Sequence, residues 1–231
     1  MPIYRLCEDI IFPPPELASG NGVLAVGGDL SPRRLVEAYR NGIFPWYSDG
    51  DPIIWWSPDP RYVLFPDELR VSRSMRQVMR RAVFEISFDR DFRAVIEACR
   101  TNRRRHEKGT WITDDMLEAY SELHDLGLAH SVEAWKDGTL AGGLYGVSLG
   151  GCFFGESMFA AVSNASKAAF IALMERLRAR GFTLVDCQVH TAHLESLGAR
   201  GIPRAEFMAL LAEALKMPTL RGNWGALMEA P

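Results

Sequence analysis

Hydrophobic and polar residues alternate along the second half of the chain in a way that predicts strands separated by helices. Four segments have the pattern of strands: residues 130–135, 140–147, 152–157 and 182–188. Asp137-Gly138 separates the first two and is typical of a two-residue hairpin turn. A long apolar helix at 164–180, capped by Ser163 or Asn164 and ended by Gly181, precedes the fourth strand. This order predicts an α/β sandwich with a mostly antiparallel sheet.

Four other helices are predicted by their start and stop residues: 31–42, 89–100, 113–126 and 203–216. The first begins with Ser31 as N-cap and Pro32 at the first helical position, and Gly42 closes its end. It lies among sixty residues rich in Pro, Gly and Trp, which resemble the loops and short strands of a small α+β domain. We therefore expect a small N-terminal domain at 1–62 and a larger domain at 63–231.

Two carboxylates interrupt the apolar pattern of the predicted strands. Glu156 follows Cys-Phe-Phe-Gly at 152–155, and Asp186 follows Phe-Thr-Leu-Val at 182–185. Because an ionised carboxylate without partners is costly to bury, a strand that carries one usually uses it. We expect Glu156 and Asp186 to lie at similar heights on neighbouring strands and to face one cleft.

Composition and charge narrow the class of protein. The chain has 231 residues, 48% of them hydrophobic, which is enough for an ordinary globular core. The net charge of −3 hides a basic segment at 70–108, where twelve Arg or Lys residues stand against five Asp or Glu. A polyanion ligand and a solvated helix face explain this segment equally well. We find neither a signal peptide nor a membrane span and expect a cytoplasmic protein.

The four cysteines are scattered, and we expect buried free thiols without disulfides. Cys187-x-x-His190-x-x-His193 is a weak zinc pattern. A core thiol with two partly solvated imidazoles explains the same residues better, so we predict no metal.

Aromatic and apolar residues suggest where a ligand binds. Trp46 and Trp111 lie in predicted loops, where an indole can stack on a base, although loop tryptophans are often lids over a core. Apolar side chains of the sheet and the 164–180 helix could surround a deep pocket, although core packing is the commoner role for each: Leu144, Met158, Phe170, Leu173 and Val185.

Eight motifs in series resemble the leucyl/phenylalanyl-tRNA-protein transferase family, from about residue 10 to 215. In chain order they are Gly27-Gly28-Asp29-Leu30, Gly42-Ile43-Phe44-Pro45-Trp46, Trp55-Trp56-Ser57-Pro58-Asp59-Pro60-Arg61, Gly109-Thr110-Trp111-Ile112-Thr113, Gly155-Glu156-Ser157-Met158-Phe159, Asn164-Ala165-Ser166-Lys167, Asp186-Cys187-Gln188 and Ser196-Leu197-Gly198-Ala199. At the level of fold, the larger domain also resembles the GNAT (acyl-CoA N-acyltransferase-like) superfamily.

The family resemblance implies a bacterial N-degron enzyme that moves Leu or Phe, and possibly Met, from aminoacyl-tRNA to an N-terminal Lys or Arg. It implies that Trp46 and Trp111 hold the terminal adenosine and that the apolar pocket receives the Leu or Phe side chain. Asp186 would polarise Gln188, whose carbonyl accepts a hydrogen bond from the attacking amine, while Glu156 acts electrostatically. The basic segment becomes a tRNA surface, for which the candidates are Arg73, Arg76, Arg80 and Arg81.

Two positions depart from the family pattern: Thr191 stands where the family has Asn, and Leu144 where it has Met. We assign Thr191 a substrate-binding role and expect a monomer that needs no cofactor. Two alternatives stay open: an acyl-CoA-dependent N-acyltransferase, and a non-catalytic adaptor that binds tRNA ends or protein N-termini. The first would need a glycine-rich pyrophosphate loop before the long helix, yet residues 158–167 contain no glycine.

Overall fold

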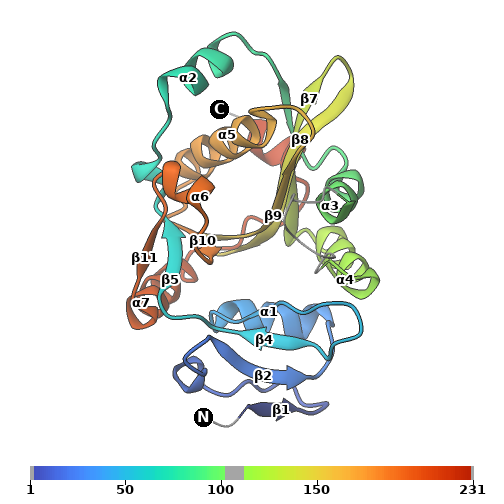
Figure 1. Ribbon diagram of the computed structural model, residues 1–231, viewed down its shortest axis with the longest axis vertical. Helices are drawn as coiled ribbons and strands as arrows, with labels where there is room; N and C mark the ends of the chain where they lie inside the picture. Colours follow the sequence, from blue (N-terminus) through green and yellow to red (C-terminus); the bar gives the residue numbers. More distant parts are fainter. Residues whose placement is uncertain (1–2, 102–111, 230–231) are drawn as a thin grey trace.

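The computed structural model describes residues 3–101 and 112–229 and shows a mixed α+β fold built on two sheets (Figure 1). The smaller sheet has the order β1-β2-β4-β3 and is formed by β1 (Tyr4–Leu6), β2 (Val23–Gly27), β4 (Ile54–Trp56) and β3 (Phe44–Pro45). Its strands are short, and the helix α1 (Pro32–Arg40) lies beside it.

The larger sheet has seven strands in the order β11-β5-β10-β9-β8-β7-β6. These are β11 (Arg200–Ile202), β5 (Arg61–Leu64), β10 (Leu184–Gln188), β9 (Cys152–Ala160), β8 (Thr139–Leu149), β7 (Ala129–Lys136) and β6 (Glu85–Phe88). All neighbours are antiparallel except β9 and β10, which pair in parallel from Leu184 opposite Cys152 to Asp186 opposite Phe154. The predicted arrangement, a meander followed by a helix and a strand beside its last member, is confirmed.

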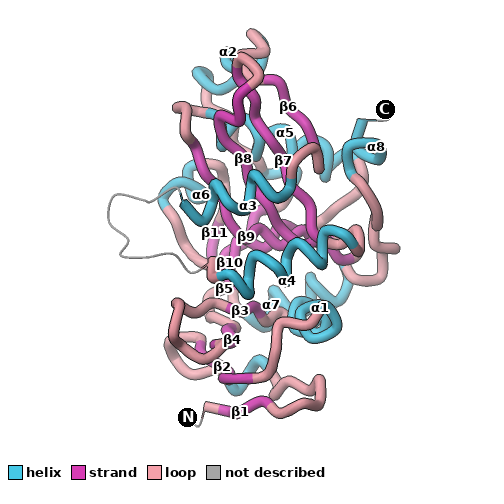
Figure 2. The backbone as a smooth tube through the Cα atoms, turned by 90° about the vertical axis from the view of Figure 1, so that its right-hand side faces the viewer, coloured by secondary structure: helices cyan, strands magenta, loops and turns pink. Residues whose placement is uncertain are grey.

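Helices cover both faces of the larger sheet (Figures 1 and 2). One face packs against α5 (Ala165–Ala179), and the other against α3 (Phe92–Thr101) and α4 (Asp114–Asp125). The remaining helices are α2 (Arg73–Arg80), α6 (Ala192–Ser196), α7 (Arg204–Ala214) and α8 (Trp224–Glu229), with short 3₁₀ turns at Pro15–Leu17 and Pro66–Glu68. Within the described residues, every helix is too short or too polar to cross a bilayer.

Local signals in the sequence placed most helix ends correctly. Ser31 and Thr113 act as N-caps and accept hydrogen bonds from the third residue of their helices, Arg34 and Met116. The start of α5 differs from the prediction because Asn164 has a φ of 72° and its side chain makes no capping hydrogen bond. Glycine has a clear role at Gly142, where an added Cβ would lie 2.6 Å from Ala165 Cβ. The helix α5 therefore starts directly against β8.

The two sheets share one hydrophobic core. A single buried cluster joins Leu24 and Leu35 from the N-terminal part to Tyr145 and Phe154 of the larger sheet. Along the chain, the last strand of the smaller sheet ends at Trp56, and the first strand of the larger sheet begins at Arg61. The domain boundary after residue 62 stays a prediction, and the shared core indicates that the N-terminal part depends on the larger sheet for its burial.

Candidate active site

Two β-bulges lie next to each other where β9 and β10 diverge. In β9, Ser157 pairs with Tyr145 and Gly155 pairs with Gly146, so Glu156 is the extra residue. In β10, the pairing with β5 likewise shifts between Asp186 and Gln188. A bulge re-aims side chains and interrupts the ladder. Glu156 is therefore aimed by the irregularity in β9, whereas Asp186 is paired in register and stands directly before the irregularity in β10.

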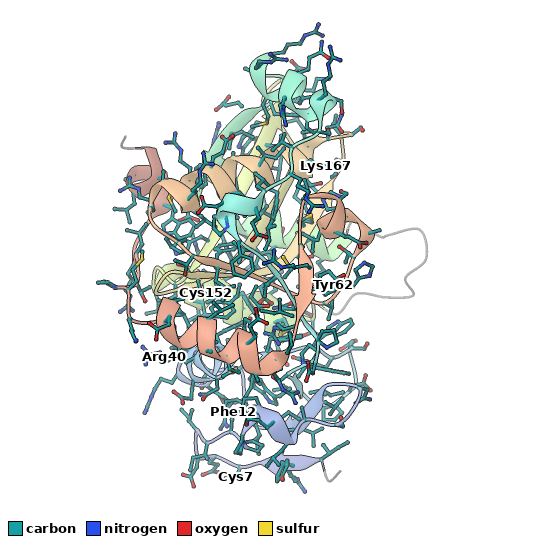
Figure 3. The ribbon with its side chains drawn as sticks, turned by 90° about the vertical axis from the view of Figure 1, so that its left-hand side faces the viewer. Cys7, Phe12, Arg40, Tyr62, Cys152 and Lys167 are labelled. Atoms are coloured by element: carbon teal, nitrogen blue, oxygen red, sulfur yellow. The ribbon has the colours of Figure 1, made fainter. Side chains whose placement is uncertain are left out.

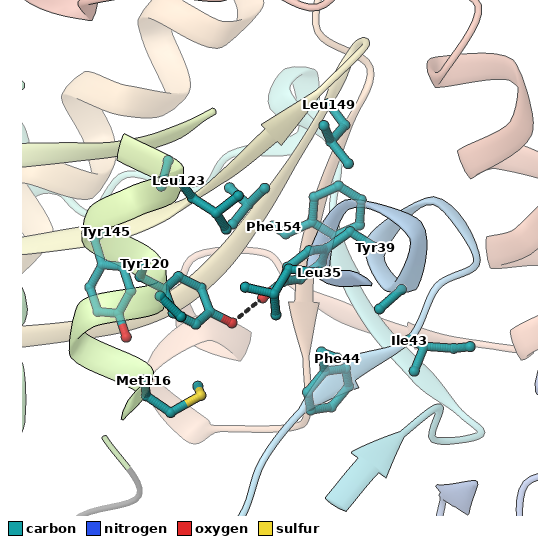
Figure 4. Close-up of a cluster of buried hydrophobic side chains, with 14 of the residues drawn as sticks. Leu35, Tyr39, Ile43, Phe44, Met116, Tyr120, Leu123, Tyr145, Leu149 and Phe154 are labelled. Atoms are coloured by element: carbon teal, nitrogen blue, oxygen red, sulfur yellow. Dashed lines mark hydrogen bonds between the residues drawn. The ribbon is translucent and has the colours of Figure 1, made fainter. Parts of the chain in front are cut away.

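Glu156 is half-buried and accepts three hydrogen bonds. The hydroxyls of Tyr39 and Tyr120 donate to Oε1 at 2.7 Å and Oε2 at 3.0 Å, and Gln188 Nε2 donates to Oε1 at 2.9 Å. The two hydroxyl oxygens also lie within hydrogen-bond distance of each other (Figure 4), and because each phenol has one proton, a bond between them takes the place of one of the two bonds to Glu156. Burial raises the pKa of Glu156 to about 7, although the three hydrogen bonds act in the opposite direction.

Tyr39 and Tyr120 contact this carboxylate and Tyr145 lies close enough to feel its charge, and all three phenols stay protonated near neutral pH. Burial, aided by the charge of Glu156, raises the pKa of Tyr39, Tyr120 and Tyr145 well above 10. Among the described residues, no group bonds the buried Tyr145 hydroxyl, and Tyr145 lines the cavity described below.

Gln188 connects the two strands. Its φ of 62° lies in the left-handed region, which a side chain other than Asn or Asp rarely adopts and which costs about 1–3 kcal/mol. Its backbone N–H donates to Asp186 Oδ1 at 2.9 Å, and its side-chain Nε2 donates to Glu156. Since an ionised carboxylate only accepts, Nε2 must face Glu156, which leaves Gln188 Oε1 free to accept from a substrate.

Asp186 forms a buried ion pair with an arginine of β5. It is fully buried and is held by Arg61, whose Nε and Nη2 donate to its two oxygens at 2.8 and 2.6 Å. The Arg61 guanidinium lies between the rings of Phe44 and Phe207, at 4.8 and 4.7 Å from their centroids. Asp186 accepts a hydrogen bond from the Gln188 backbone, whereas Glu156 accepts one from the Gln188 side-chain amide, so the polarising role of Asp186 stays a prediction.

A cavity of about 1240 Å³ opens beside this cluster. Glu156 and Gln188 lie on its wall, whereas Asp186 does not line it. The α5 side of the cavity is mostly apolar and includes Phe153, Phe170 and Cys187. The opposite side carries polar groups from α3 and α4, including Arg100, Thr113 and Asp114. The cavity can therefore hold an apolar side chain and a polar group at once.

Most of the predicted substrate-binding residues meet at this cavity. The lining residues among them are Trp46, Leu144, Met158, Phe170, Val185 and Thr191. Leu173 is fully buried in the core and does not line it. Trp46 is 41% exposed, with its ring 5.6 Å from that of Trp56, which leaves indole surface open to solvent. Trp111 lies outside the described residues.

Thr191 has a structural task besides any contact with substrate. Its side chain is the N-cap of α6 and accepts a hydrogen bond from Leu194 N at 3.2 Å. The hydroxyl proton remains able to donate into the cavity, which Thr191 lines.

The four predicted tRNA-binding arginines are exposed at α2, which Figure 1 shows at the top of the molecule. Arg73, Arg76 and Arg80 belong to the helix, and Arg81 follows it. None of them forms an ion pair within the described ranges. Their charge is therefore free for a polyanion.

The weak zinc pattern does not form a site in the structure. No three His, Cys, Asp or Glu side chains of the described residues converge on one point. His190 Nε2 instead lies 3.0 Å from Glu195 Oε2. Burial raises the pKa of the Cys187 thiol far above its ordinary value, so the thiolate that attacks or binds a metal is disfavoured. Cys152 is also buried, whereas Cys7 is exposed, contrary to the expectation of buried thiols.

Sequence reasoning missed the residues that hold this site in place. Arg61 belongs to a quoted motif, but nothing near it in sequence signals a partner 125 positions away. Tyr39 belongs to the apolar stripe of α1, so the sequence pattern predicts that its ring is buried but does not indicate what its hydroxyl contacts. Chemically, the site combines a carboxylate with a pKa of about 7, a free amide carbonyl and protonated phenols. These groups suit an attack by an external amine on an activated carbonyl.

Comparison with known proteins adds a family to this geometry. The profile described as "Leucyl/phenylalanyl-tRNA protein transferase" matches residues 63–212, and the profile of the N-terminal domain of the same family matches residues 28–59. Two relatives named leucyl/phenylalanyl-tRNA–protein transferase match nearly the whole chain. The protein of Syntrophus aciditrophicus (strain SB) is 64% identical, covering 97% of this chain and 94% of the relative. That of Myxococcus xanthus (strain DK1622) is 57% identical, covering 97% of both.

Among solved structures, "The structure of L-PGS from Bacillus licheniformis" matches with a TM-score of 0.41 and 12% sequence identity. The match covers 73% of this chain and 54% of that chain.

Proposed function

Because this chain belongs to the leucyl/phenylalanyl-tRNA protein transferase family and is an aminoacyltransferase, we propose that it transfers Leu or Phe, and possibly Met, from aminoacyl-tRNA to an N-terminal Lys or Arg. The product would carry a new hydrophobic N-terminus and be marked for the N-degron pathway. The observation that most supports this function is the hydrogen bond between Glu156 and Gln188, which lies at the wall of a cavity with one apolar and one polar side.

The apolar side of the cavity suits the donor side chain. Leu144, Phe170 and Val185 are nearly fully buried, so a Leu or Phe side chain entering between them is removed from water. Selection there would depend on size and apolarity, with about 1–3 kcal/mol for each methylene. Trp46 at the rim offers an exposed indole on which the terminal adenine can stack.

The reaction forms one amide bond and breaks one ester bond. The α-amine nitrogen of the acceptor attacks the carbonyl carbon of the aminoacyl ester, and the ribose oxygen leaves with its bonding electron pair. One proton moves from the amine toward the leaving oxygen. An α-amine has a pKa of about 7.7–8.0, so a useful fraction is already neutral near pH 7. The protein then has to orient the amine and help remove one proton.

In this mechanism Gln188 contacts the attacking amine and Glu156 sets the orientation of Gln188. Ionised Glu156 accepts from Nε2, so Gln188 Oε1 faces the cavity and accepts a hydrogen bond from the amine. When Glu156 is protonated, its O–H can donate to Oε1 instead, and the amide then presents a donor to the amine. With the pKa of Glu156 about 7, the productive arrangement is lost as the pH falls through 7.

Asp186 and Arg61 are positioning residues in this proposal. They fix the backbone of Gln188 in its left-handed conformation and do not touch the substrate. Direct attack also needs no covalent intermediate, which agrees with the protonated state favoured for Cys187.

The tRNA body would lie against α2, where exposed arginines without ion-pair partners could neutralise phosphates. Family membership favours aminoacyl transfer over the acyl-CoA and adaptor alternatives. A cytoplasmic location follows from the proposed tRNA substrate, and the monomeric state stays a prediction.

The proposal is tested by incubating the protein with Leu-tRNA and a peptide that begins with Arg, followed by mass measurement. We expect one added leucine at the peptide N-terminus. The matched controls are the same peptide with an acetylated N-terminus and one that begins with Asp, and neither should react. An unchanged mass for the Arg peptide, with intact Leu-tRNA recovered, would contradict the proposed function.

A further inference from the structure

The N-terminal end of α5 has no side-chain cap. Asn164, which precedes the helix, holds the left-handed conformation that glycine usually supplies. Within residues 3–101 and 112–229, no group accepts a hydrogen bond from the backbone N–H of Ser166 or Lys167. The fifteen-residue helix therefore presents unsatisfied donors and the positive end of its dipole.

Ser166 gives an independent reason to expect a ligand at this point. It lines the cavity and is only 8% exposed, yet its hydroxyl has no hydrogen-bond partner in the part of the chain that the structure describes. Because Ser166 lines the cavity, its hydroxyl is open to a hydrogen bond with a ligand bound there. The next residue, Lys167, is half-buried and has no ion-pair partner among the described residues.

We propose that the start of α5, with Ser166 and Lys167, binds a phosphodiester of the single-stranded 3′ end of the donor RNA. This assignment rests on the proposed function. The donors and the positive charge select an anion. The carboxyl group of the amino acid is esterified in the donor and therefore uncharged, and the acceptor residue is a cation. The phosphates of the RNA backbone are therefore the anions that the reaction brings to this site.

The position of this site fits a strand that runs from the tRNA body to the cavity. Figure 3 shows Lys167 below α2 and above Tyr62 on the same face of the molecule. Phosphates held first at α2 and then at the start of α5 would lead the 3′ end toward Trp46, which lines the same cavity as Ser166. A phosphodiester at α5 would fix the direction of the strand before its last nucleotide.

The test compares three non-hydrolysable leucylamide analogues: of adenosine, of the dinucleotide CpA and of the trinucleotide CpCpA. Dissociation constants are measured by calorimetry for the full-length protein at several salt concentrations. In the unchanged protein we expect the trinucleotide analogue to bind at least about tenfold more tightly than the nucleoside analogue. In Ser166→Ala and Lys167→Met this gain should fall below about threefold, with unchanged affinity for the nucleoside analogue. The dependence of log Kd on log salt should become shallower by about 0.7 for the lost phosphate contact.

Variants at Asn164 test the geometry of the helix start. Asn164→Gly allows the left-handed φ and should keep the gain, whereas Asn164→Val opposes that φ and should lose it. Lys136→Met, which removes a lysine at the end of β7, is the matched control and should bind like the unchanged protein.

A gain that persists in both Ser166→Ala and Lys167→Met, or no gain in the unchanged protein, would overturn the proposal. Coenzyme A that competes as well as the trinucleotide, and that loses affinity in Lys167→Met, would overturn the assignment to RNA. If the nucleoside analogue itself does not bind and no leucine is transferred from Leu-tRNA, the proposed function fails instead. The two failures are therefore distinguishable.

Discussion

Replacing Glu156 by glutamine should make the protein more stable and less active at the same time. Burial raises the pKa of Glu156 from 4.5 to about 7, and each pKa unit is worth about 1.4 kcal/mol. Ionised Glu156 therefore lowers the free energy of unfolding by about 3 kcal/mol above pH 7. Between pH 4.5 and 7 the folded protein holds this proton more tightly than the unfolded chain, so stability falls as the pH rises through that window. The amide side chain of the Glu156→Gln variant has no charge and therefore no such loss.

Urea unfolding at pH 5 and pH 8 measures the effect directly. At pH 8 we expect Glu156→Gln to raise the free energy of unfolding by about 3 kcal/mol, and at pH 5 by less than about 1 kcal/mol. Leucine transfer should fall because a neutral amide in place of the carboxylate no longer fixes the orientation of the Gln188 amide. The exposed carboxylate Glu175 gives a matched control, and Glu175→Gln should change neither quantity. Equal stability of wild type and Glu156→Gln at both pH values would refute the reasoning.

Three further predictions follow from the site and from α2. Arg61→Met leaves Asp186 buried without its partner and should lower the free energy of unfolding, measured in urea, by about 3–5 kcal/mol. Arg61→Lys keeps a positive charge and should lower the free energy of unfolding by less. An unchanged urea midpoint in the Met variant would contradict the positioning role. Phe170→Ala enlarges the apolar side of the cavity and should lower kcat/KM for Leu-tRNA by about tenfold or more, with an unchanged ratio as the contrary result. Each Arg→Ala change on the exposed α2 surface should reduce the slope of log Kd for tRNA against log salt by about 0.9 per lost phosphate, and an identical slope would remove these residues from the tRNA surface. The α2 residues are Arg73, Arg76, Arg80 and Arg81.

The hairpin, the order of strands and helices, and most helix starts could be predicted because each depends on a local signal. Asp137-Gly138 lies between β7 and β8, and Ser31 caps α1. The amphipathic helix α2 and the C-terminal helix α8 were not predicted as helices. Trp224 of α8 is fully buried and stacks on His130 at 3.9 Å, a tertiary contact that the local pattern does not announce.

At the site, the sequence indicated which residues matter but not what each one contacts. Glu156 was found because a carboxylate interrupts an apolar strand, yet the bulge that aims it appears only when β8 and β9 are paired. The partner of Asp186 could not be predicted because Arg61 belongs to a distant strand and the pair depends on β5 lying beside β10. Ser163 or Asn164 was predicted to cap the long helix, and the N-cap position is Asn164, but without a side-chain hydrogen bond. Its left-handed backbone angle could not be predicted, because such an angle at a residue other than glycine leaves little trace in the sequence.

Gln188, held by Glu156, is the residue that contacts the attacking amine at the wall of the cavity in the proposed mechanism. The most direct test is the single-turnover rate of leucine transfer from saturating Leu-tRNA to a peptide that begins with Arg, in wild type and in Gln188→Ala. We predict a fall of about a hundredfold or more, the range for a lost proton-transfer or orienting group, with an unchanged Kd for Leu-tRNA. Equal single-turnover rates in the two proteins would contradict the account.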